Sequence, residues 1–75
     1  MTGVMDVMDP TGHTKVHWDS SIPAEVDAAR DTFNALRAKG YSAFKMKKFG
    51  GQGKRLDCFD PDAEAMIMIP QLQGG

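Results

Sequence analysis

The chain has 75 residues, of which 41% are hydrophobic and 25% charged, with a formal net charge of −1. This length allows one domain with a small core and leaves no room for a large enclosed active site, and the near-neutral charge argues against long-range attraction to nucleic acid or an anionic membrane. A single cysteine, no basic-then-apolar leader and no long apolar run predict a cytoplasmic, disulfide-free protein that does not span a membrane.

The first predicted unit is a β-hairpin with strands at residues 3–8 and 14–19. Asp9, Pro10 and Gly12 lie between them and are typical of a tight turn. Val16 and Trp18 alternate with polar residues. The second strand should therefore have one buried and one exposed face.

A helix is predicted next, over residues 23–39. Ser20 or Ser21 offers an N-terminal cap, Pro23 suits the first turn, and Gly40 is the expected stop. The residues that form its apolar stripe are Val26, Ala29, Phe33 and Leu36. This stripe should pack against the sheet.

Alternating side chains predict a second hairpin, with strands at residues 41–48 and 54–59 joined by a glycine-rich loop. Cys58 stands in the same phase as Leu56, so we expect a buried thiol rather than a reactive one. The last strand, residues 65–69, does not alternate and is wholly apolar. Such a run indicates a central strand, or a binding patch on the free face of the sheet, where flexible methionines would help a partner to bind.

The sequence then ends in "PQLQGG", and here it resembles a known family. Hairpin, helix, further strands and a C-terminal Gly-Gly form the element order of ubiquitin-like β-grasp proteins. The stretch "AMIMIPQLQGG" is similar to the tails of the small sulfur carriers of molybdopterin and thiamine biosynthesis. The resemblance covers the element order of the whole chain, but only about the last eleven residues in detail.

This resemblance implies a β-grasp domain over residues 1–70 and a flexible tail over residues 71–75. It also implies that an ATP-dependent adenylating enzyme activates the Gly75 carboxylate, for conjugation to a protein or for sulfur transfer to a small-molecule acceptor. Gly74 and Gly75 would be the functional residues, and Pro70 and Leu72 would contact the partner. Two glycines suit this role because they offer no Cβ to hinder entry into a narrow channel.

The fold prediction is therefore an α+β domain of order β-β-α-β-β-β, with a single mixed sheet and one helix on one face. In a β-grasp the last strand runs parallel beside the first. The connection of only five residues, 60–64, instead favours an antiparallel hairpin between 54–59 and 65–69, which would make the sheet a meander. We favour the β-grasp and keep the meander as the alternative.

A second hypothesis places the function on the sheet itself, in a non-catalytic protein-binding or regulatory module. Basic and aromatic residues cluster around the second hairpin: Phe44, Lys45, Lys47, Lys48, Phe49, Lys54 and Arg55. Such a cluster can follow a phosphate backbone, but the chain as a whole is not basic, so a solvated face or a protein-docking surface is favoured over nucleic acid.

No enzyme, cofactor or metal is expected from the remaining polar residues. Asp6, Asp9, His13 and His17 lack a defined ligand spacing and read as surface groups. The acidic residues around Pro61 suit a turn, and no residue pattern supplies a pocket for acid–base chemistry.

Overall fold

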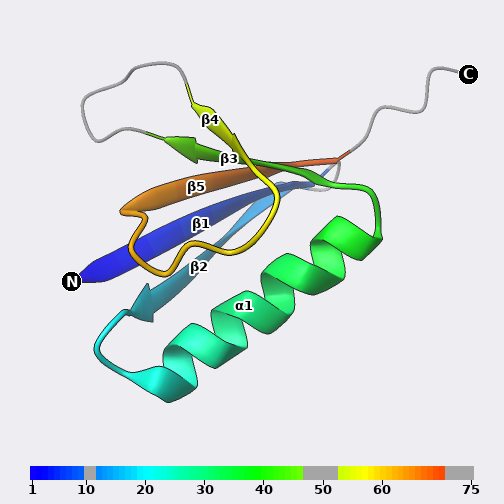
Figure 1. Cartoon of the computed structure of the whole chain (residues 1–75). Helices are drawn as coiled ribbons and strands as arrows, with labels where there is room; N and C mark the ends of the chain where they lie inside the picture. The colour runs from blue at the N-terminus through cyan, green and yellow to red at the C-terminus, as the bar shows by residue number, and fades with distance from the viewer. Residues whose placement is uncertain (10–11, 47–52, 71–75) are drawn as a thin grey trace, which may run out of the picture.

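The computed structural model describes residues 1–9, 12–46 and 53–70. It shows a small α+β fold with one mixed five-stranded sheet and one helix, so the predicted fold class is confirmed at this level. The elements in chain order are β1 (Thr2–Asp9), β2 (Gly12–Asp19), α1 (Pro23–Ala38), β3 (Ser42–Met46), β4 (Lys54–Leu56) and β5 (Ala65–Ile69). Helix α1 lies across one face of the sheet (Figure 1), and we call the opposite face the open face.

The strand order in the sheet is β2-β1-β5-β3-β4, which places β5 at the centre. Strand β1 runs antiparallel to β2 and parallel to β5, while β3 runs antiparallel to both β4 and β5. The prediction that residues 65–69 form a central strand is confirmed. The antiparallel hairpin between 54–59 and 65–69 does not form, because β5 pairs with β1 and β3 instead of β4.

The hydrophobic core lies between α1 and the sheet. Its buried side chains are Met5, Val7, Trp18, Val26, Ala29, Phe33, Ala43, Phe59, Ala63, Met66 and Met68. The predicted helix stripe is confirmed, with Leu36 partly buried at its end. The predicted alternation in β2 is also confirmed, because Trp18 is buried and Val16 packs against the core.

Helix α1 begins without the serine cap that the sequence suggests. Its N-cap is Ile22, which has extended backbone angles and makes no side-chain capping bond. The Ser20 hydroxyl donates instead to the Met1 carbonyl oxygen at 3.0 Å, and the Ser21 hydroxyl donates to Asp19 Oδ1 at 2.7 Å. The cap prediction was wrong because both hydroxyls bond elsewhere, one to the first residue of the chain and the other to the last residue of β2. The bonds from the Ser21 hydroxyl and backbone N–H lower the pKa of Asp19.

The helix ends as predicted. Gly40 has a φ of 98°, a conformation that favours glycine. Its N–H donates to the Arg37 carbonyl oxygen, and the N–H of Tyr41 donates to that of Leu36, both at 3.0 Å. This pair of bonds is a Schellman motif, which satisfies the last carbonyls and turns the chain into β3.

Residues 57–64 carry the chain from β4 to β5 across the helix side of the sheet (Figure 1). Phe59 is buried and lies edge-on to Trp18 and Phe33, with ring centroids 5.0 and 5.8 Å away. The Trp18 Nε1–H donates to the Pro61 carbonyl oxygen at 3.0 Å. These contacts draw the chain away from β4, so the prediction of a strand over 54–59 was wrong beyond Leu56.

Cys58 is exposed, which contradicts the buried position predicted from the alternation with Leu56. The strand has already ended at Leu56, so a period of two no longer applies two residues later. The next residue, Phe59, enters the core in its place. Within the described ranges, no helix is long and apolar enough to cross a membrane.

Candidate functional site

The pairing of the strands decides which side chains share the open face. Residues directly opposite each other in neighbouring strands point to the same side of a sheet. Phe44 of β3 lies opposite Ile67 of β5 and Arg55 of β4, so these three side chains share one face. Met66 and Met68 are buried in the core on the helix side. The apolar run of β5 therefore serves two surfaces, the core and the open face.

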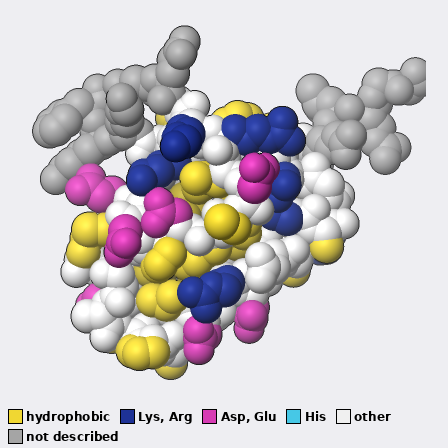
Figure 2. All heavy atoms as spheres, in the orientation of Figure 1, with side chains coloured by type: hydrophobic (Ala, Val, Ile, Leu, Met, Phe, Trp, Pro, Cys, Tyr) yellow, Lys and Arg dark blue, Asp and Glu magenta, His cyan; other side chains and the backbone are white. Residues whose placement is uncertain are grey.

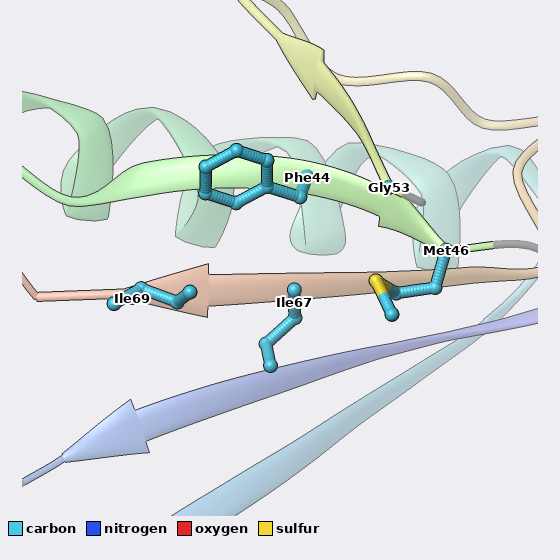
Figure 3. Close-up of a pocket in the computed structure, with 5 residues that line it drawn as sticks. All are labelled: Phe44, Met46, Gly53, Ile67 and Ile69. Atoms are coloured by element: carbon cyan, nitrogen blue, oxygen red, sulfur yellow. The ribbon is translucent and has the colours of Figure 1, made fainter. Parts of the chain in front are cut away.

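A shallow groove of about 420 Å³ lies on this open face. It is lined by Phe44, Met46, Gly53, Ile67 and Ile69. The close-up in Figure 3 shows the four side chains standing on β3 and β5, with α1 behind the sheet. Ile69 keeps 40% of its surface exposed, so the groove offers apolar surface to solvent.

Gly53 is placed where a side chain would narrow this groove. A Cβ added there would lie 3.0 Å from Met46 Sδ and 3.3 Å from Phe44 Cβ, closer than ordinary van der Waals contact. Its backbone does not adopt the positive φ that reserves a position for glycine. The absence of a side chain thus leaves space in the groove, as glycine in a sheet often does where another molecule comes close.

The charges beside the groove are uneven. Arg55 shares the face of Phe44, is exposed, and makes no ion pair with any described residue. On the other side of β5, Asp6 of β1 lies opposite Ile67, and its Oδ1 is 3.6 Å from Lys15 Nζ. The β1 side of the groove is therefore charge-compensated, whereas the β4 side carries an uncompensated positive charge.

Lys45, which the sequence analysis placed in the same surface as Phe44, is used elsewhere. It lies opposite Met66, so it points to the helix side of the sheet, and its Nζ is 3.1 Å from Asp60 Oδ2. Burial raises the pKa of Asp60. The hydrogen bonds from Lys45 and from the Asp62 N–H, together with the lysine charge, lower it by more. The net effect is a pKa below the usual range.

The alternation of the strands divides the predicted basic surface between two faces. Phe44 and Arg55 lie on the open face, while Lys45 and Lys54, which pair with each other in register, lie on the other. Figure 2 views the helix side, where acidic and basic side chains surround a central hydrophobic region. Three further predicted residues lie outside the described part of the chain: Lys47, Lys48 and Phe49.

The predicted activation site follows the central strand. Pro70 comes directly after β5 and is half-buried. Leu72, Gly74 and Gly75 lie outside the described residues. In the described ranges, no group of three or more His, Cys, Asp or Glu side chains is arranged to hold a metal ion.

A binding patch within residues 65–69 was one expectation from the sequence, but Met46, Gly53, Ile67 and Ile69 were not individually predicted as site residues. The signal for Ile67 and Ile69 was the lack of alternation in residues 65–69. Successive side chains of a strand point to opposite faces, so an apolar run on a one-helix sheet leaves apolar side chains on the face without the helix. Met46 had a weaker signal, as an apolar residue in phase with Phe44. Gly53 had none, since nothing separates it in sequence from the other loop glycines.

In comparisons with models of protein families, with curated proteins and with solved structures, no match to this chain was found.

Proposed function

We propose that the protein is a ubiquitin-like β-grasp protein that acts through the carboxylate of Gly75. A partner adenylating enzyme joins this carboxylate to the AMP of ATP and releases pyrophosphate. An amine of another protein, or sulfide-level sulfur from a donor, then displaces AMP and leaves an amide or a thiocarboxylate at Gly75. The proposal includes that Gly75 is the mature carboxyl terminus, whether encoded or exposed by a protease. The chain itself is the substrate of this chemistry and supplies no catalytic group.

The observation that carries the proposal is the parallel pairing of β1 with the central strand β5. A meander would have placed β5 antiparallel to β4, whereas a β-grasp needs the last strand parallel to the first. This pairing supports the reading of the element order, and with it the reading of "IPQLQGG" as a tail of that family.

The position of Pro70 supports the same proposal. Proline has no N–H to donate, so it ends strand pairing directly after β5. β5 is hydrogen-bonded on both sides, which makes it a firm base from which a tail can reach a partner. Glycines at the end of such a tail can extend into a narrow channel and leave the carbonyl open to a nucleophile.

The test uses an N-terminally tagged full chain expressed in its own host, beside a variant that lacks Gly74 and Gly75. Denaturing gels of the tagged protein should show covalent adducts, or a thiocarboxylate-specific label should react, only when both glycines are present. A matched control replaces Gln71 and Gln73 by alanine and should keep the reaction. If the variant without the glycines reacts equally, the proposal fails.

A second candidate function is a non-catalytic module that binds another protein through the open face of the sheet. The groove between Phe44, Met46, Ile67 and Ile69 favours it. Under this function, deletion of Gly74 and Gly75 leaves partner binding unchanged, while changes in the groove abolish it.

A further inference from the structure

The groove on the open face is apolar and lies beside the positive charge of Arg55, and these two features indicate the chemistry of a ligand. We propose that it docks a segment of another protein in which a large apolar side chain stands next to one or more carboxylates. This inference rests on the second candidate function, because it names the partner chemistry of that surface, and it does not require the activated tail.

The groove has room for a large apolar side chain and offers it apolar contacts. Phe44 and Met46 come from β3, and Ile67 and Ile69 from the adjacent β5, so apolar groups line the groove from two strands. A volume of about 420 Å³ falls within the range of roughly 300–1,000 Å³ that is common for ligand pockets. A single buried anchor of this kind dominates the affinity of many protein interfaces.

Gly53 keeps the groove open at its β4 side, which is a feature beyond an uncovered sheet face. A side chain there would press on Met46 and Phe44, the two β3 residues of the groove. The φ of Gly53 does not demand glycine, so what glycine contributes at this position is space, beside these two side chains and beside the Lys45 carbonyl oxygen, which would lie 3.2 Å from an added Cβ. The groove is thus open at the point nearest to β4, which also carries Arg55.

The uncompensated charge of Arg55 sets the chemistry of the partner. The carboxylates closest along the chain are engaged elsewhere, since Asp57 lies 3.9 Å from Arg37 and Asp60 pairs with Lys45. Residues 47–53 contain no Asp or Glu. The Arg55 guanidinium therefore has no ion-pair partner among the described residues, and a partner carboxylate would supply one.

A protein segment fits this surface better than a nucleic acid. Nucleic-acid binding depends on several cations along a phosphate backbone. Among the described residues near the groove, Arg55 is the one cation without an ion pair, and Lys15 is paired with Asp6. Of the described residues that line the groove, Phe44 alone is aromatic, whereas single-strand binders stack successive bases on several rings.

The probe is a short synthetic peptide with one Phe followed by two Glu in an otherwise Gly/Ser sequence, titrated into the full ¹⁵N-labelled chain without ATP. Amide shifts should change at Met46, Gly53, Arg55, Ile67 and Ile69 and stay constant along α1. Replacing Phe by Ser, or both Glu by Lys, should abolish the shifts. Shifts spread evenly over the surface, or equal binding of the Lys peptide, would overturn the proposal.

Two variants of β4 provide a matched comparison. Arg55→Glu and Lys54→Glu make the same charge change on neighbouring residues of opposite faces. Arg55→Glu should weaken the peptide about three- to tenfold, the range expected for an exposed ion pair replaced by repulsion, whereas Lys54→Glu should change the affinity less than twofold. Equal losses in both variants would show a non-specific charge effect and contradict the site.

Ile67→Thr and Gly53→Ala test the apolar part. Threonine keeps the branched shape that suits a strand, so the fold should be retained while the anchor loses its contact, and alanine at position 53 should narrow the groove. Both should weaken the peptide with unchanged far-ultraviolet circular dichroism. Displacement of the peptide by oligo-dT, or burial of this face in a dimer of the chain, would each replace the proposal by another occupant.

The result is separable from that for the tail. Deleting Gly74 and Gly75 should leave peptide binding intact. In the Arg55→Glu variant, the activating enzyme should still be able to modify the Gly75 carboxylate. Failure of one experiment therefore does not imply failure of the other.

Discussion

Gly3 shows how tightly the β1–β2 hairpin is packed against the segment before β5. A Cβ at this position would overlap the Trp18 ring at Cζ2 and lie 2.7 Å from the Ala63 carbonyl oxygen. Backbone cannot move as a flexible side chain can, so the strain would be shared by the whole hairpin. Glycine here allows the Trp18 ring to lie directly over the strand.

We therefore expect Gly3→Ala to lower the free energy of unfolding by about 1–3 kcal/mol, the usual cost of overpacking. Urea denaturation followed by tryptophan fluorescence measures it. Thr2→Ala, at the exposed neighbouring position, is the control and should change stability by less than about 0.5 kcal/mol. A Gly3→Ala protein as stable as the parent would show that the contact with Trp18 relaxes freely.

Asp60 gives the chain a dependence of stability on pH. Its pKa is lowered in the folded state, so the ionised form is favoured by folding. That contribution is fully present above the unfolded pKa, near 3.9, and is lost as the pH falls through the lower folded pKa. Acid should therefore weaken the protein below about pH 4.

Asp60→Asn should flatten this acid limb when urea midpoints are compared between neutral and acidic pH. Asp62→Asn is the control, because Asp62 contributes its backbone N–H to Asp60 and the substitution keeps that donor. An unchanged acid limb in Asp60→Asn would contradict the role assigned to the bond from Lys45.

Helix α1 begins without a side-chain hydrogen bond at its N-cap. Ile22 occupies the N-cap with φ −112° and ψ 101°, and 41% of its surface is exposed. Serine prefers these extended angles and accepts a bond from the first turn. Ile22→Ser should stabilise the protein by about 0.5–1 kcal/mol.

Thermal unfolding of Ile22→Ser and Ile22→Ala separates this effect from the loss of the isoleucine side chain. The serine variant should melt above the alanine variant, because only serine can cap. If the two melt together, the first turn already has its donors satisfied, as the N–H groups of Glu25 and Val26 are by the Ile22 carbonyl oxygen at 3.0 and 3.1 Å.

The elements that the sequence predicted well are those with a long, regular period. The stripe over Val26, Ala29 and Phe33 and the stop at Gly40 identify α1 within one residue of its observed end. The alternation of Val16 and Trp18 identifies the buried side of β2. In both cases local pattern and tertiary packing agree, so local reasoning suffices.

The failures concern places where a distant contact overrides the local pattern. Cys58 has the phase of a buried strand residue, but Phe59 is drawn between Trp18 and Phe33 and ends the strand at Leu56. The groove also joins residues from strands that are far apart in sequence, so only the pairing of β3 with β5 reveals it. Sequence could indicate that residues 65–69 had surplus apolar surface, but not which side chains would share it.

In the whole molecule, the most apolar strand of the chain, β5, lies at the centre of the mixed sheet. β5 is bonded to β1 and β3, so residues 65–69 should be among the last to open, while Pro70 has no N–H with which to continue the pairing. Deleting Gly74 and Gly75 should therefore change the free energy of unfolding by less than about 0.5 kcal/mol. A larger loss in urea denaturation would mean that the tail contributes to the fold.

Intact-mass and peptide mass spectrometry of the protein isolated from its own host tests the central claim most directly. The account predicts that a fraction of the chain carries its modification at Gly75, either an amide bond to an acceptor or the replacement of one carboxylate oxygen by sulfur. The contradicting result is a Gly75 carboxylate that is always free, in a protein that is stably bound to a partner through its sheet in the same cells.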